Sequence, residues 1–129
     1  WGKEIQTFSI TKIGDSVTIY NAPAEPRIVS VASTATLSIS SSTTDQSIIT
    51  AQSEALTIAT PTGTPVEGQK LIIRIKDDGS ARAITFNAIF RAIGITLPTT
   101  TVSSKITYLG LVYNSTDTKW DVIATKTEA

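Results

Sequence analysis

Residues 69–86, QKLIIRIKDDGSARAITF, contain the pattern that decides the fold. From residue 70 to 76, the aliphatic residues Leu71, Ile73 and Ile75 alternate with positions that are mostly charged. This period of two is typical of a strand with one buried face. Asp78-Gly79 separates it from a second extended run at 81–86, and an Asp-Gly pair between two extended runs is typical of a tight hairpin turn. The stretch therefore predicts an antiparallel β-hairpin.

The composition of the whole chain favours strands in the same way. The 129 residues include 22 threonines, 14 serines, 18 isoleucines and 7 valines. Side chains branched at Cβ are stiff at χ1 and suit a pleated, half-buried surface. Short extended runs recur along the sequence, with turn-forming residues about every 8–12 positions, as in sandwiches and jelly rolls. The sequence predicts an all-β domain, an antiparallel β-sandwich or jelly roll.

A polar run at residues 40–46 divides this domain into two parts. We expect residues 1–46 to form an N-terminal β-strand region or attachment segment that packs with the rest. Residues 47–129 would form the C-terminal β domain. A length of 129 residues suits one hydrophobic core better than two independent ones.

The charge balance argues against two classes of partner. Eleven basic and eleven acidic residues give a formal net charge of zero, so nothing in the overall charge attracts nucleic acid or anionic lipid. No apolar run approaches the length of about 20 residues that spans a bilayer. We expect neither nucleic-acid binding nor membrane insertion.

The residues available for catalysis and metal binding are few. The chain has no cysteine, histidine or methionine, which removes thiolate and imidazole ligands and the commonest general base. Asp77, Asp78 and Asp117 lie in turn-forming stretches, and their spacing matches no calcium loop. Glu54 or Glu67 would have to stand about 5–10 Å from one of them to act as a glycosidase pair. We expect the chain to have no enzymatic activity and to bind neither a metal nor a cofactor.

Arginines and tyrosines are the candidates for a subunit interface. Arg74, Arg82 and Arg91 occur in the most strongly patterned region, and arginine is favoured in planar ion pairs and at interfaces. Tyr108 and Tyr113 belong to a run at 105–113 that is apolar on both faces. A strand of that kind is expected to be covered on both faces, by the core on one side and a neighbouring subunit on the other.

Three further aromatic residues, Trp1, Tyr20 and Trp120, are candidates for stacking on sugar rings. Trp120 begins an alternating strand with Val122 and Ala124 on the same side. A large aromatic residue in that position contributes most to a small domain when it is buried. The core is therefore the favoured place for Trp120, with the sugar-binding role as the alternative.

A series of short motifs follows in order along the second part of the chain. They are Gly68-Gln69, Arg74-Ile75-Lys76-Asp77, Thr85-Phe86, Phe90-Arg91, Leu97-Pro98 and Trp120-Asp121-Val122. With them, residues 47–129 resemble a C-terminal module of structural proteins of tailed bacteriophages, found on tail fibres, tail tips or head fibres. Residues 1–46 show no such resemblance.

The resemblance implies a non-catalytic virion component, serving as a fibre tip, a capsid decoration or an attachment module. It implies a homotrimer that contacts other virion proteins and a glycan or protein of the host surface. Such a protein is assembled in the host cytoplasm, and a chain without cysteine suits that reducing compartment. The alternative function is a carbohydrate-binding module of a receptor-binding protein, which requires exposed, coplanar aromatic rings.

Overall fold

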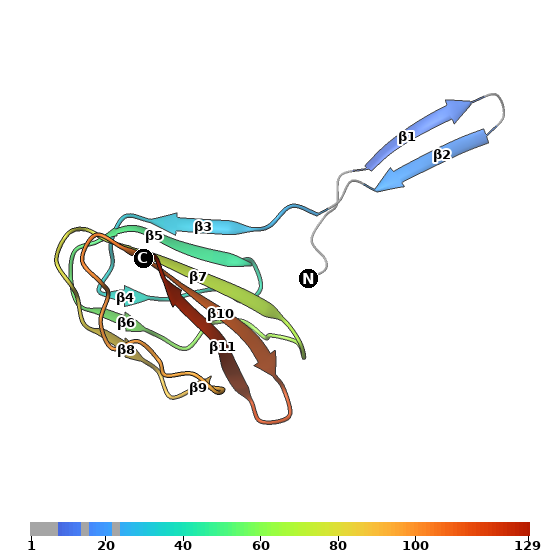
Figure 1. Ribbon diagram of the computed structural model, residues 1–129. Coiled ribbons are helices and arrows are strands. Elements are labelled where there is room, and N and C mark those ends of the chain that lie inside the picture. The colour runs from blue at the N-terminus through green and yellow to red at the C-terminus, as the bar shows by residue number, and fades with distance from the viewer. Residues whose placement is uncertain (1–7, 14–15, 22–23) are drawn as a thin grey trace.

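The computed structural model describes residues 8–13, 16–21 and 24–129, and side chains from residue 24 onward. These residues form strands, turns and loops without a helix (Figure 1), so the all-β prediction is confirmed. The described residues contain no helical segment with the length and apolarity needed to cross a membrane. The strands are β1 (Phe8–Ile13), β2 (Ser16–Asn21), β3 (Ile28–Val31), β4 (Thr36–Leu37), β5 (Gln46–Gln52), β6 (Leu56–Ile58), β7 (Lys70–Asp77), β8 (Ile84–Phe86), β9 (Phe90–Ala92), β10 (Ile106–Asn114) and β11 (Lys119–Thr127).

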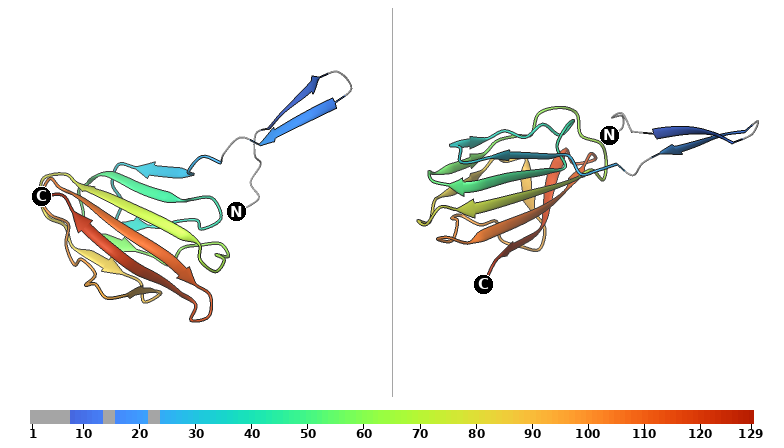
Figure 2. Two further views of the ribbon diagram at one scale, coloured as in Figure 1. Left: turned by 45° about the vertical axis from the view of Figure 1, so that its right-hand side comes forward. Right: turned by 90° about the horizontal axis from the view of Figure 1, so that it is seen from above.

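The described strands form three sheets. The largest has six strands in the order β3-β5-β7-β10-β11-β9, and a smaller one has three strands in the order β4-β6-β8. The third is the β1–β2 hairpin, which stands apart from the other two in every view (Figures 1 and 2).

The strand directions correct the prediction of an antiparallel fold. From β3 to β8 the chain passes from one sheet to the other after every strand. Each strand therefore returns beside the strand two before it and runs parallel to it, as in β3–β5, β5–β7, β4–β6 and β6–β8. Antiparallel pairing holds for β7–β10 and β10–β11. The Asp78-Gly79 stretch, which suggested a hairpin turn, instead carries the chain across to the other sheet.

The predicted hairpin at residues 69–86 is wrong for this reason, and the Asp77 side chain explains the difference. The buried carboxylate accepts hydrogen bonds from Gly79 N at 2.8 Å, Ser104 N at 2.9 Å and Thr101 Oγ1 at 2.5 Å. Gly79 has φ of 133°, in the region that favours glycine. The carboxylate thus turns the chain out of the six-stranded sheet towards β8, which pairs with β6.

Gln52 also holds connections between the two sheets through side-chain hydrogen bonds, in this case two earlier crossings. Its buried side chain donates from Nε2 to the carbonyl oxygens of Thr34 at 2.8 Å and Glu54 at 2.7 Å. Its Oε1 accepts from Thr34 N at 3.2 Å. One side chain thereby satisfies backbone groups in the β3–β4 and β5–β6 connections. Asp78 N donates to the Gln52 carbonyl at 3.2 Å, which joins these crossings to the one at Asp77.

One hydrophobic cluster joins the two larger sheets. The three-stranded side supplies Leu37, Leu56 and Ile58, and the six-stranded side supplies aliphatic residues of β5, β7, β10 and β11. Trp120 is only 1% exposed, so its predicted place in the core is confirmed. The boundary expected between residues 46 and 47 falls within β5, and β3 and β4 of the first part pair with β5 and β6 of the second.

Asp77 makes the stability depend on pH. Burial alone would raise the pKa of its carboxyl, but the hydrogen bonds from Thr101, Ser104 and Gly79 outweigh burial and lower it. An aspartate in an unfolded chain has a pKa of about 3.9. The ionised group therefore stabilises the fold above that pH, and the stabilisation is lost as pH falls below it towards the lower folded-state pKa.

Replacing Asp77 by asparagine tests this account. We expect Asp77→Asn to lower the free energy of unfolding at pH 7 by about 1–3 kcal/mol, because one acceptor oxygen of a buried, fully bonded group is lost. The variant should also show a weaker loss of stability between pH 4 and pH 2. Urea unfolding measures both effects, with the exposed neighbour substitution Asp78→Asn as control. Equal losses in the two variants, or an unchanged acid slope, would contradict the assignment.

Candidate interaction surface

The surface of the six-stranded sheet that faces away from the core is the main candidate site. Along β7, β10 and β11 its side chains alternate with buried ones, as the strand period requires. We call this surface the outer face. Its central members are Gln46 of β5, Lys70, Ile72, Arg74 and Lys76 of β7, Ile106, Tyr108, Gly110 and Val112 of β10, and Asp121, Ile123, Ala124 and Lys126 of β11.

Apolar side chains occupy the middle of the outer face. Tyr108 is 42% exposed and Ile123 is 51% exposed, and Ile72 is exposed beside them. The strand register aligns Ile72 with Gly110, and Gly110 with Ala124, across three neighbouring strands. Small residues at the centre leave a shallow surface with larger apolar groups around it. Contiguous exposed apolar surface of this kind marks interaction sites more often than isolated apolar residues do.

Four cations surround the apolar residues, namely Lys70, Arg74, Lys76 and Lys126. The ion pairs among the described residues involve other arginines. Arg74 instead donates to Tyr108 Oη at 3.4 Å, and Lys76 donates to the Ser104 carbonyl at 2.6 Å. None of the four cations forms an ion pair with another residue whose side chain is described. The outer face therefore carries more cations than carboxylates, although the whole chain is neutral.

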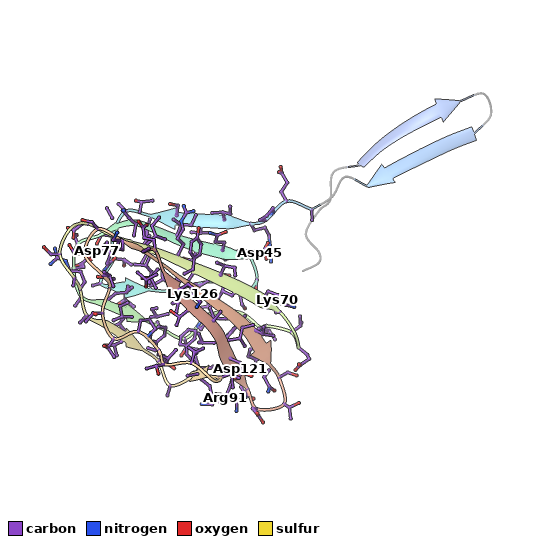
Figure 3. The ribbon with its side chains drawn as sticks, in the orientation of Figure 1. Asp45, Lys70, Asp77, Arg91, Asp121 and Lys126 are labelled. Atoms are coloured by element: carbon purple, nitrogen blue, oxygen red, sulfur yellow. The ribbon has the colours of Figure 1, made fainter. Side chains whose placement is uncertain are left out.

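Asp121 is an acidic residue of the outer face, and Arg91 forms an ion pair with it (Figure 3). A second carboxylate, that of Glu128, lies at the end of the face, where it accepts a hydrogen bond from Ile106 N at 3.0 Å. The Arg91 guanidinium donates to Asp121 at 2.8 and 3.1 Å, and pairs with Asp117 at 3.0 Å. The hydrogen bond from Arg91 is the main cause of the lowered pKa of Asp121, and Asp121 in turn raises the pKa of Arg91. The cluster joins β9 to β11, and the single guanidinium of Arg91 is shared by the two carboxylates.

A groove of about 620 Å³ adjoins the outer face where β5 and β7 begin. Pro26, Gln46, Val66 and Ile72 contribute to its lining, together with the Arg27–Asp45 pair. Arg27 donates to both oxygens of Asp45, at 3.1 Å from Nε and 2.7 Å from Nη2. That bond from Arg27 is the main cause of the lowered pKa of Asp45.

Two further polar residues of the groove, Gln69 and Glu67, also form hydrogen bonds. Gln69 Oε1 accepts from Val66 N at 3.1 Å, and Gln69 Nε2 donates to the Ser41 carbonyl at 2.6 Å. Glu67 accepts from Ser115 N and Oγ, both at 2.8 Å, and the bond from the Ser115 backbone is the main cause of its lowered pKa. The groove thus combines apolar contact area with the side chains of Glu25, Gln46 and Lys70. Across the part of the chain with described side chains, no three acidic residues gather as a metal site would require.

The structure brings together some of the predicted interface residues and separates others. Arg74 and Tyr108 are cross-strand neighbours on the outer face, and Arg91 lies at the edge of the same sheet. Arg82 lies in the β7–β8 crossing, where it donates to both oxygens of Asp78 at 3.3 Å. Tyr113 is a correction, because its ring is buried and packs on Trp120 with centroids 5.1 Å apart.

The candidates for sugar stacking need a second correction. Trp120 is buried and cannot stack on a sugar from its place in the core. Trp1 and the side chain of Tyr20 lie outside the described residues. Of the described tyrosines and tryptophans, Tyr108 alone is exposed. Coplanar, exposed rings are therefore not found in the part of the chain with described side chains.

The expectation that residues 105–113 are covered on both faces is not met within one chain. Leu109 and Leu111 are buried against the core, whereas Tyr108 on the opposite side is exposed. The sequence analysis also missed Lys70 and Lys126 as members of the outer face. The alternation along β7 and β11 could have identified them, since each takes a position opposite to the buried residues.

Two adjacent isoleucines test which face of β7 is free. We expect Ile73→Ala to lower the free energy of unfolding by about 2–5 kcal/mol, because it removes buried volume from the core. Ile72→Ala, on the outer face, should cost less than about 1 kcal/mol. Urea unfolding followed by circular dichroism measures both. Similar losses for the two variants would show that Ile72 is buried as deeply as Ile73.

Comparisons of the chain with models of protein families, with curated proteins and with solved structures find no match. The resemblance of residues 47–129 to phage virion modules therefore stays an expectation from the sequence motifs.

Proposed function

We propose that this chain is a structural and interaction module of a tailed-phage virion, with a sandwich-like β architecture and no catalytic role. It acts by forming a homotrimer and by binding other virion proteins, as a fibre tip, a capsid decoration or an attachment module. The observation that carries the binding role is the outer face, with exposed Ile72, Tyr108 and Ile123 surrounded by cations. The ordered motifs of residues 47–129 provide the phage context.

The charge of the outer face favours an acidic protein surface as its partner. Lys70, Arg74, Lys76 and Lys126 would face their own counterparts if two copies met outer face to outer face, and like charges in a dehydrated interface are costly. An acidic partner would compensate them while its apolar residues cover Ile72 and Ile123. The homotrimer therefore uses other surfaces, and the outer face remains available for a second virion protein or a host-surface molecule.

The hydrogen bonding of the carboxylates supports a role without catalysis. A glycosidase needs one acid held in protonated form beside a second, ionised one. Asp77, Asp45, Glu67 and Asp121 each have a pKa lowered by the hydrogen bonds that they accept. All four carboxylates are thereby favoured in the ionised form, which suits turns and ion pairs.

Two measurements test the proposal together. Sedimentation of the full chain at micromolar concentration should give three times the monomer mass of 13.7 kDa. Electron microscopy of purified particles of the encoding phage, labelled with an antibody against residues 47–129, should show the chain at fixed positions and in a copy number divisible by three. Particles treated with pre-immune antibody are the control.

The two outcomes are separable. A chain that is absent from purified particles would overturn the virion assignment. A monomer at micromolar concentration would overturn the trimer, even if the chain is present in the particles.

A further inference from the structure

Strand β3 leaves one edge of the six-stranded sheet open. It is the terminal strand of the order β3-β5-β7-β10-β11-β9 and pairs on one side with β5. All four residues, Ile-Val-Ser-Val, are exposed, with Ile28 at 54% and Val29 at 47%. An edge strand presents unpaired backbone groups that can accept another strand. Proteins usually protect such edges with charges, proline or bulges, and the four residues of β3 contain none of these.

The opposite edge of the same sheet is protected. Strand β9 has three residues, and Arg91 at its centre is held by Asp117 and Asp121. A short strand with a charged residue is a poor template for strand addition. Of the two edges of this sheet, the one at β3 is therefore open and apolar, whereas the one at β9 is protected.

The β1–β2 hairpin lacks a neighbouring strand within the described structure. Its two strands pair with each other through Phe8↔Asn21 to Ile13↔Ser16, and with no other described strand. An isolated two-stranded hairpin is marginally stable in water and needs a third strand or a packed face. The hairpin stands away from the two larger sheets (Figure 2), so its own domain does not supply that support.

The connection to β3 favours a partner in another copy. Six residues, 22–27, separate β2 from β3, and they can span at most about 20 Å. Two of them are Pro23 and Pro26. Proline fixes φ and favours extended linkers, whereas pairing of β2 with its own β3 would require the linker to reverse direction. Exchange of an identical element between copies avoids that reversal.

We propose that the β1–β2 hairpin of one copy adds to the open edge of β3 in a second copy. The contact joins two different surfaces, so it is heterologous, and heterologous contacts close into rings when the rotation permits. Three copies that each donate a hairpin and each accept one form such a ring. This inference rests on the proposed homotrimer and names the contact that builds it. The outer face stays uncovered in the ring.

Cross-linking in this cysteine-free chain tests the contact. One copy carries Thr11→Cys or Thr18→Cys, two positions that are register partners in the hairpin, and also a tag that changes its size. The other copy carries Ser30→Cys on β3. After co-expression, a flexible bis-maleimide should link tagged to untagged chain with either hairpin cysteine. Thr85→Cys, exposed on β8 in the other sheet, replaces Ser30→Cys in the control and should give no product.

A second variant blocks the edge without touching the core. Val29→Lys places a charge at an exposed position of β3, and we expect it to convert the trimer to monomer in sedimentation. Thr57→Lys, exposed on the central strand of the three-stranded sheet, is the matched control and should leave the trimer intact. Unchanged circular dichroism shows that each variant is folded.

Three results would overturn the exchange. The first is a cross-link between two Ser30→Cys copies without any cross-link to a hairpin cysteine. The second is a cross-link within a single chain that carries both a hairpin cysteine and Ser30→Cys. The third is the absence of any cross-link in a chain that sediments as a trimer. In the third case the homotrimer stands and another surface builds it. A chain that sediments as a monomer removes the proposed trimer itself, so the two failures are distinguishable.

Discussion

The fold depends on satisfying backbone hydrogen bonds where the chain leaves one sheet for the other. Each crossing removes a segment from its ladder, and buried backbone groups without partners are costly. Gln52 and Asp77 supply those partners at one end of the six-stranded sheet, and both are buried. At the other end, Ser41 Oγ donates to the Thr62 carbonyl at 2.7 Å. The abundance of short hydroxyl side chains suits these crossings as well as the strand faces.

This arrangement also leaves particular surfaces free. Because β3, β5 and β7 come from successive windings of the chain, the six-stranded sheet begins with a strand that has one neighbour. The core uses one face of that sheet, so the cations and apolar residues of the other face serve no core contact. Figure 3 shows Lys126 over β11 and Lys70 near the start of β7, on the outer face. The proposed phage module and the proposed hairpin exchange use these two free surfaces separately.

The sequence predicted strands and their buried faces well, because the period of two is a local property. Leu71, Ile73, Ile75 and Trp120 are buried as their patterns indicated. Strand pairing was not predictable in the same way, since an Asp-Gly turn is compatible with a hairpin and with a crossing. The hydrogen bonds from Thr101 and Ser104 to Asp77 favour the crossing, and they join residues more than 20 positions apart in the sequence. The sequence identified two residues of the candidate interface, Arg74 and Tyr108. It did not show the charge of the outer face, because the cations come together only when β7, β10 and β11 lie side by side.

The most direct test of this account is hydrogen exchange at the side-chain amide of Gln52, measured by NMR. If that side chain holds the crossings, its two protons should exchange as slowly as backbone amides in the central strands and should show contacts to Thr34 and Glu54. The partly exposed Gln46 serves as a fast-exchanging reference. Exchange at Gln52 as fast as at Gln46, without those contacts, would contradict the claim that buried polar side chains hold the crossings.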